Sequence, residues 1–489
     1  MIYLRVQTAL TSWPMPATHT VIIHGWSDCS ESFVALKKFM EGSGVANVGT
    51  IFYADYESRE DNLTFDDVVD GLNDEFIKQG FIDKGGQPLV NLNVVVHSTG
   101  GLVIRHWISR YYLDSKASRD LCPVKRIIML APANFGSPLA HRGKSFLGSL
   151  FKGRWKIGDL LEVGRQLLDG LELGSPYQWH LAHLDLLSGL EPYSAERIQV
   201  TILVGAKDYD GARGWINKPG TDGTVVIAGT SLNALKLTLD CTKGKGEGDT
   251  YTPYEWSAED PVDEYAWAVL PGLDHGGIVD SAATKGTLAA DMLLEALSCK
   301  TPAAFKTLCT RAEKITVDTY AQTQKPRFQQ FAVRAVDDQG NPILDFTLEF
   351  FILKASKSTN GIARDSKLSD AEQDFSDEAQ KLLLGEVHTH SQDPSHRRLL
   401  VDTGKLKSLL SNAATLLAEP VTLSMRVYVP RIDGGISYAV DQLQNVVLHH
   451  TGAKTNAPAF LFENTTTLLE IQVNRVNTFV TVGKTPRKH

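Results

Sequence analysis

Short apolar runs alternate with longer helical patterns through the first 300 residues, and this alternation limits the possible folds more than any other feature of the chain. The runs are rich in β-branched residues and largely apolar, as strands buried on both faces of a parallel sheet should be. The predicted strands are residues 20–23, 49–53, 90–96, 126–130, 199–204 and 267–270. Helical patterns fit between them at residues 31–40, 64–79 and 102–113. This order predicts an α/β fold with a mostly parallel sheet covered by helices on both faces.

Two segments interrupt the alternation. Residues 141–190 carry apolar residues at helical spacing and are predicted to form a helical cap or lid, with ordinary core helices as the alternative. Residues 233–263 contain a run of glycines and charges and are interpreted as a loop between two short extended pieces. Both segments are therefore predicted as insertions into the α/β unit.

The character of the sequence changes after about residue 300. Strand-like stretches follow, separated by turns, and one helix is predicted at residues 405–417. We therefore predict an α/β domain over residues 1–300, a linker over 301–325 and a mainly-β, sandwich-like domain over 326–489. The strand-like stretches are residues 331–336, 346–353, 421–429 and 468–482.

Length and charge exclude several classes of protein. The 489 residues exceed what one hydrophobic core normally serves, and 43% hydrophobic with 22% charged residues is ordinary globular usage. The net charge of -8 and the pI near 6.0 argue against a nucleic-acid partner, because phosphate neutralisation needs a basic surface. The five cysteines are scattered without paired spacing, and we expect them to be reduced and not to form a zinc cage.

The sequence gives no sign of a membrane-spanning helix or a secretory leader. It has no stretch of about 18 uncharged apolar residues, so any membrane contact is predicted to be peripheral. Residues 1–16 lack the charged, apolar and small-residue order of a signal peptide. We therefore expect a cytoplasmic location as synthesised, with non-classical export left open.

One serine stands where a strand meets a helix. The apolar strand Val94-Val95-Val96 runs into His97-Ser98-Thr99-Gly100-Gly101 and then into a helical pattern. This order predicts that Ser98 sits on a sharp turn, with its hydroxyl clear of the sheet and helical N–H groups facing a developing oxyanion. Val96 replaces the first glycine of the usual G-x-S-x-G pattern, so either the turn is opened or a facing residue is small. A structural serine at an ordinary strand-to-helix turn is the alternative.

A nucleophilic serine needs a base and an acid later in the chain. His275 follows an apolar strand and lies among glycines that permit close approach; a solvated loop histidine is the alternative. Two carboxylates could orient its imidazole: Asp222 and Asp208, of which Asp208 directly follows a strand. The predicted oxyanion donors are the backbone N–H groups of Trp26, in a loop after another strand, and Thr99.

Together these motifs resemble the serine lipases and esterases of the α/β-hydrolase fold, notably bacterial lipases and the GPI-inositol-deacylase-like hydrolases. The resemblance implies hydrolysis of carboxylic esters through an acyl-enzyme on Ser98. It favours Asp222 as the acid, because Asp222-Gly223-Thr224-Val225-Val226 resembles the acid loop of the family. The other matching pieces are His24-Gly25-Trp26, the segments 97–101, 131–138 and 174–177, and Asp274-His275-Gly276.

The resemblance is incomplete at a metal position. Calcium-binding relatives have an aspartate two residues after the histidine, where this chain has Gly277, so we predict no bound metal and no cofactor. The alternating histidines His388, His390 and His396 are interpreted as a polar strand face rather than a metal site.

The predicted apolar cap favours a lipid ester as substrate, as in a lipase or phospholipase. An acyltransferase on the same scaffold and a non-catalytic lipid-binding or interaction protein are the alternatives. The sequence does not assign a role to the C-terminal domain.

Overall fold

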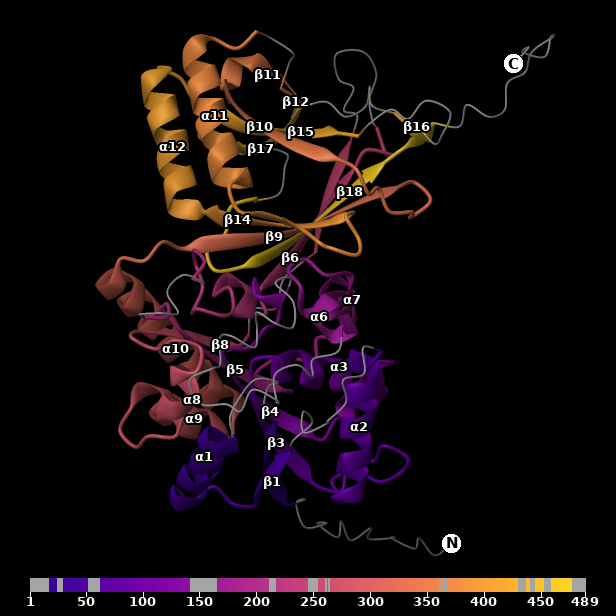
Figure 1. Cartoon of the computed structure of the whole chain (residues 1–489), viewed down its shortest axis with the longest axis vertical. Coiled ribbons are helices and arrows are strands. Elements are labelled where there is room, and N and C mark those ends of the chain that lie inside the picture. The colour runs from indigo at the N-terminus through magenta and orange to yellow at the C-terminus, as the bar shows by residue number, and fades with distance from the viewer. Residues whose placement is uncertain are drawn as a thin grey trace, which may run out of the picture.

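The computed structural model of the chain places a parallel sheet with its helices at one end and two further sheets at the other (Figure 1). It describes residues 17–23, 30–51, 62–140, 165–210, 217–244, 254–259, 262, 264–359, 362–363, 367–429, 437–439, 445–452 and 459–476. Among these residues, no helix combines the length and the apolar character needed to cross a lipid bilayer.

The parallel sheet is formed by the predicted apolar runs. It has six strands in the order β2-β1-β3-β4-β5-β8, and all neighbouring pairs are parallel. Residues 52–53 of the second predicted strand lie outside the described residues. The strands are β1 (Thr18–Ile23), β2 (Val48–Ile51), β3 (Asn91–His97), β4 (Val124–Leu130), β5 (Gln199–Gly205) and β8 (Ala266–Leu270).

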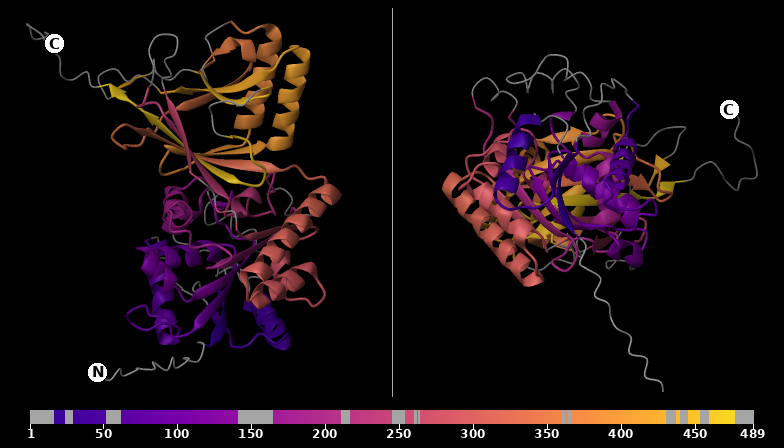
Figure 2. Two further views of the ribbon diagram at one scale, coloured as in Figure 1. Left: turned by 180° about the vertical axis from the view of Figure 1, so that it is seen from behind. Right: turned by 90° about the horizontal axis from the view of Figure 1, so that it is seen from below.

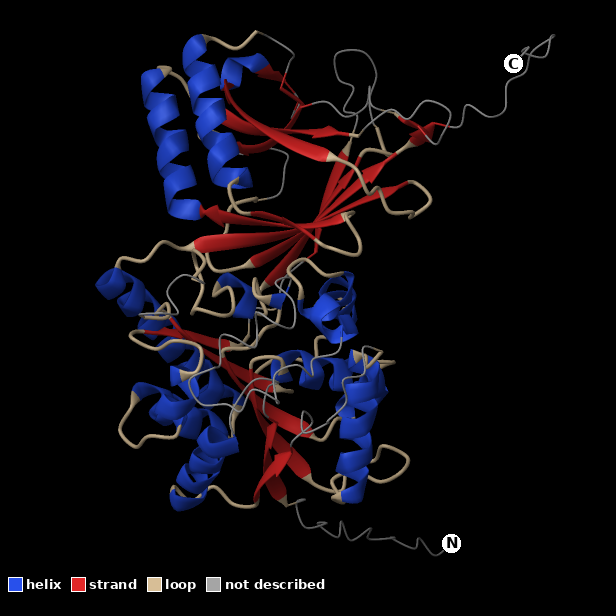
Figure 3. Cartoon of the chain, viewed as in Figure 1, coloured by secondary structure: helices blue, strands red, loops and turns tan. Residues whose placement is uncertain are grey.

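Helices cover both faces of this sheet, as predicted (Figure 3). Residues Val69, Leu72 and Phe76 form the buried side of one helix, which Thr64 starts through a reciprocal capping box with Asp67. The helices of this part are α1 (Ser30–Gly42), α2 (Phe65–Lys78), α3 (Gly100–Tyr112), α4 (Lys116–Asp120), α6 (Arg165–Leu171), α7 (Pro176–Asp185), α8 (Gly277–Ala282) and α9 (Leu288–Ser298); a short 3-10 turn, η3, spans Ala228–Thr230.

The segment predicted as a linker is a long helix, α10 (Pro302–Thr323). Thr301 caps its start and Pro302 occupies the first turn, where a missing N–H costs nothing. Its buried residues Phe305 and Leu308 belong to the core of the parallel-sheet part, and Thr316 accepts a hydrogen bond from the backbone N–H of Val269 at 3.0 Å. Figure 2 shows α10 running along one side of the molecule toward the upper sheets. The domain boundaries themselves stay a prediction.

The second part contains two larger sheets, in agreement with the predicted sandwich-like β structure. One is a six-stranded mixed sheet in the order β13-β14-β9-β18-β6-β7, and the other is a five-stranded antiparallel sheet in the order β10-β15-β17-β12-β11. A small pair, β16 (Ser437–Tyr438) with β19 (Arg475–Val476), lies apart. The remaining strands are β6 (Ala234–Asp240), β7 (Glu255–Glu259), β9 (Phe328–Asp337), β10 (Thr347–Lys354), β11 (Ser358–Thr359), β12 (Ile362–Ala363), β13 (Val387–Thr389), β14 (His396–Asp402), β15 (Val421–Tyr428), β17 (Asn445–His450) and β18 (Thr466–Val473); a 3-10 turn, η5, spans Ala355–Lys357.

The segment interpreted as a loop at residues 233–263 joins the two parts of the molecule. Its two extended pieces are β6 and β7, which pair with each other antiparallel. β6 also pairs in parallel with β18, from Thr466 opposite Ala234 to Gln472 opposite Asp240. The strand pair β6 and β7, which precedes α10 in the chain, therefore completes a sheet of the second part.

Two helices pack beside these sheets, and one of them was not predicted. α12 (Thr403–Leu416) corresponds to the helix predicted at residues 405–417, whereas α11 (Asp370–Leu384) is new. The sequence signal for α11 is the capping box formed by Ser369 and Glu372. Ala379 and Leu383 of α11 share one core with residues of both larger sheets.

Candidate active site

Ser98 occupies the predicted turn between β3 and α3. Its φ of 54° is left-handed, which is a strained conformation for a residue with a side chain. Hydrogen bonds hold the turn: the N–H of Ser98 donates to the carbonyl of Leu130 at 3.1 Å, and its carbonyl accepts from Ala133 N–H at 3.0 Å. The strain is thus maintained by tertiary contacts around one serine.

Two glycines let the helix approach the sheet at this turn. A Cβ on Gly100 would lie 3.0 Å from the carbonyl oxygen of Ile23 and 3.1 Å from the Cβ of Val96. A Cβ on Gly101 would lie 2.8 Å from Pro132 Cβ, closer than real side chains come. Gly100 is therefore the small facing residue that the bulk of Val96 requires.

A chain of hydrogen bonds links Ser98 to His275 and Asp222. The His275 Nε2 lies 3.2 Å from Ser98 Oγ, and its Nδ1 lies 2.9 Å from Asp222 Oδ2. The three residues are 6%, 2% and 0% exposed, respectively. Because a buried ionised carboxylate only accepts, Nδ1 carries the proton and the lone pair of Nε2 faces the serine hydroxyl.

The other oxygen of Asp222 is held by its own loop. Asp222 Oδ1 accepts from the backbone N–H groups of Thr224 at 3.0 Å and Val225 at 2.8 Å. The backbone of His275 is tied to the same residue, since its N–H donates to the carbonyl of Asp222 at 3.0 Å. Imidazole and carboxylate are thereby fixed to each other through side chain and main chain.

Asp208, the alternative acid, lies in a different pair. Its Oδ2 accepts from Lys325 Nζ at 2.9 Å, and the Asp208 side chain is 41% exposed. Thr99 directly follows the serine and is buried at the start of α3, so its N–H belongs to the helix N-terminus. Trp26 lies outside the described residues, together with His24 and Gly25.

The described part of the predicted cap, residues 165–190, is bound to α3, the helix that follows Ser98. Residues 141–164 lie outside the described part, whereas α6 and α7 lie between the parallel sheet and the upper sheets (Figure 1). Arg105 of α3 and Asp185 of α7 form a fully buried pair, with Nε to Oδ2 at 2.7 Å and Nη2 to Oδ1 at 2.9 Å. Tyr193 donates a further hydrogen bond to Asp185 at 2.9 Å. The sequence analysis missed this pair, although one arginine inside an apolar helical run was the available signal.

The second part of the molecule packs against the loop that carries Asp222. A small buried cluster joins residues of the two parts, and Gln330 of β9 donates to the carbonyl of Phe135 at 3.3 Å. A Cβ on Gly220 would lie 2.6 Å from the Phe328 ring, so the acid loop and β9 touch. The members of the cluster are Leu173, Val226, Ala228, Phe328 and Leu400.

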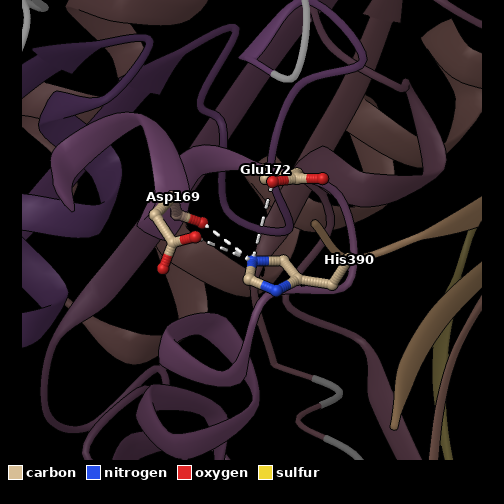
Figure 4. A group of neighbouring side chains, drawn as sticks. All are labelled: Asp169, Glu172 and His390. Carbon is tan, nitrogen blue, oxygen red and sulfur yellow. Dashed lines mark hydrogen bonds and ion pairs between the residues drawn. The ribbon is translucent and has the colours of Figure 1, made fainter. Parts of the chain in front are cut away.

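A group with metal-ligand composition lies where the cap meets the second part. Ligand atoms of Asp169, Glu172 and His390 all lie within 4.8 Å of one another (Figure 4). However, Nδ1 of His390 accepts from the backbone N–H of Asp393 at 3.1 Å, so the ring proton sits on Nε2, the atom that faces the two carboxylates. A metal-bound histidine needs the opposite arrangement, with the other nitrogen donating. The group fits a hydrogen-bonded contact better than a metal site.

Glu172 is the anchor of this contact. Its Oε1 accepts from His388 Nε2 at 2.6 Å, and its Oε2 accepts from the hydroxyl of Ser391 at 2.6 Å. Burial raises the pKa of Glu172, but the hydrogen bonds from His388 and Ser391 outweigh it, and the pKa lies below its ordinary value. Of the histidines interpreted as a polar strand face, His388 and His390 thus hydrogen-bond to the cap segment, whereas His396 pairs with Asp393 in its own loop. His390 and His396 are buried.

The parallel sheet with a serine at its strand-to-helix turn defines an α/β-hydrolase fold, and the second part adds a mainly-β unit. Comparison with solved structures identifies a particular protein of similar build. The structure is similar to phospholipase PlaB from Legionella pneumophila with a TM-score of 0.74 and 22% identity, over 96% of this chain and 98% of that chain. The same phospholipase in complex with thio-NAD gives a TM-score of 0.73 over the same shares, also at 22% identity. No protein-family model matches the chain, and no curated protein matches its sequence.

Proposed function

We propose that the chain is a serine-dependent carboxylic ester hydrolase that acts on lipid esters. The observation that carries the proposal is the hydrogen-bonded chain from Ser98 Oγ through His275 to Asp222, set on a strained strand-to-helix turn. A strained serine whose hydroxyl meets the unprotonated nitrogen of a buried, carboxylate-bound imidazole has the arrangement of an activated nucleophile. No metal or cofactor is needed for that chemistry.

In the first half of the reaction, His275 Nε2 takes the proton of Ser98 as Oγ bonds to the ester carbonyl carbon. The tetrahedral oxyanion would be held by the backbone N–H groups of Thr99 and Trp26. As it collapses, the bond between carbon and the alcohol oxygen breaks, and His275 returns the proton to the leaving alcohol. An acyl group remains on Ser98.

In the second half, water gives a proton to His275 and its oxygen bonds to the acyl carbon. The bond to Ser98 Oγ then breaks, the serine regains its proton from His275, and the carboxylic acid leaves. Asp222 keeps the imidazole in its productive tautomer and stabilises the imidazolium that forms in each half.

Two observations support a lipid substrate. The segment after β4 carries α6 and α7, which lie between the parallel sheet and the upper sheets, where a cap would cover an acyl chain. The structural neighbour with the same build over both parts is described as a phospholipase. Contact with a membrane surface, where such substrates reside, is part of the proposal.

The test uses a serine-reactive alkyl phosphonate on the parent protein and on Ser98→Ala. We expect one label per parent chain, placed at Ser98 by peptide mass analysis, and none on the variant. A series of esters of rising chain length, below and above their aggregation limits, then measures the lipid preference. A folded Ser98→Ala protein that hydrolyses esters at the parental rate contradicts the mechanism. Equal rates at all chain lengths contradict the lipid substrate, and transfer to an added alcohol in preference to water identifies an acyltransferase.

A further inference from the structure

His97 is a buried imidazole one residue before the proposed nucleophile. It ends β3, is 2% exposed, and packs near the Phe33 ring with a centroid distance of 6.1 Å. A polar ring in such a place lowers stability unless it is hydrogen-bonded. An apolar side chain would fill the site without that requirement, so the hydrogen bonding of His97 indicates a role.

The ring of His97 reaches across to the loop of His275. Its Nε2 lies 3.1 Å from the backbone carbonyl oxygen of His275, and the two ring centroids are 4.7 Å apart. A carbonyl oxygen only accepts, so Nε2 carries a proton and donates. The two residues are 178 positions apart in the chain, and this hydrogen bond connects the end of β3 directly to the loop after β8.

This hydrogen bond completes the restraint on the backbone of His275. On the other side of the residue, the N–H donates to Asp222, and upstream the carbonyl of Leu273 accepts from Lys207 N–H at 2.9 Å. Leu273 also lies directly against Gly205, where a Cβ would come within 2.0 Å of its carbonyl oxygen. The loop that carries His275 is thus held by Asp222 and by the end of β5. His97, at the end of β3, holds it as well.

We propose that His97 is a positioning residue: by donating its Nε2–H to the carbonyl of His275, it keeps that imidazole aligned between Ser98 and Asp222. The inference rests on the proposed function, because it assigns His275 as the base. Proton transfer depends steeply on alignment, and a displacement of about 1 Å costs on the order of 100-fold in rate. His97 itself does not touch the substrate or the reacting atoms.

The experiment compares three substitutions in the full-length protein with a soluble chromogenic ester. His97→Phe keeps the ring volume but has no donor, whereas His97→Gln places an amide N–H near the position of Nε2. We expect kcat of His97→Phe to fall about 10- to 100-fold with KM within about twofold, and His97→Gln to recover most of the loss. His97→Asn, equally polar but too short to reach the carbonyl, should behave like His97→Phe. Thermal unfolding of each variant checks that the fold is kept.

Parental kcat in a folded His97→Phe protein, or equal losses in His97→Phe and His97→Gln, overturns the positioning role. If His97→Phe does not fold, the pair of Asn and Gln variants makes the same comparison, and equal kcat values for the two overturn it. Ser98→Ala is measured in parallel. If Ser98→Ala keeps the parental activity, the proposed function is wrong. If Ser98→Ala is inactive and His97→Phe keeps the parental kcat, only the positioning role of His97 is wrong.

Discussion

Replacing Asp222 with asparagine should reverse the tautomer of His275. Oδ1 of Asp222 accepts from the N–H groups of Thr224 and Val225, so an asparagine must place its amide oxygen there. Its NH₂ group then points at His275 Nδ1, which lies 2.9 Å from Oδ2 in the parent. To accept from that NH₂, Nδ1 must be unprotonated, and the ring proton moves to Nε2, facing Ser98 Oγ. The imidazole can then no longer take the proton of the serine.

The loss in kcat should be large, because His275 keeps its position but can no longer accept the proton of Ser98. A carboxylate-to-amide change at this position of such a triad lowers kcat by about 10⁴-fold, which corresponds to about 5 kcal/mol at 1.36 kcal/mol per factor of ten. We expect a loss of that order in kcat of Asp222→Asn, with KM little changed. Initial rates of ester hydrolysis measure it, and thermal unfolding verifies that the variant is folded.

Asp208→Asn is the matched control. Asp208 is bound to Lys325 and is partly exposed, so its substitution should leave kcat within about twofold of the parent, since exposed pairs contribute little. A folded Asp222→Asn protein within tenfold of the parental kcat refutes the tautomer argument. A large loss in Asp208→Asn alone would instead make Asp208 the acid.

Two further predictions concern stability. Burial lowers the pKa of Arg105, but Asp185 raises it by more. Arg105→Met removes the buried partner of Asp185, which keeps only the hydrogen bond from Tyr193, and should lower the free energy of unfolding by about 3–5 kcal/mol. Urea unfolding measures this, the double variant with Asp185→Leu should lose less than the two single variants combined, and an unchanged midpoint for Arg105→Met refutes the argument. Burial also lowers the pKa of His396 to about 4, against an unfolded value of about 6.5, so the unfolded chain binds that proton more readily and stability is lost as pH falls from about 6.5 to 4. The thermal midpoint should therefore fall less between pH 7 and pH 5 in His396→Gln than in the parent, and equal falls contradict the prediction.

The sequence by itself determined the strands of the parallel sheet and the positions of Ser98 and His275 at the ends of two of them. Most strands of that sheet contain a short apolar run, such as Val94-Val95-Val96 in β3, and burial on both faces makes such a run recognisable without knowing its partner. The turn at Ser98 is equally local, because a strand, two glycines and a helix follow one another within a few residues. His275 was predicted on similar local grounds, because it follows an apolar strand and lies among glycines.

Only the tertiary structure decided which distant residues meet. β6 pairs with β18, a strand more than 200 positions later, and no local pattern in residues 233–263 names that partner. The residues alone left the choice between Asp222 and Asp208 open for the same reason: Asp208 directly follows a strand and Asp222 lies in a loop, and only the fold places Asp222 at His275 and Asp208 at Lys325. Periodicity records which face of an element is buried, whereas hydrogen bonds such as those of Glu172 with His388, or His97 with His275, depend on where two remote segments come to lie.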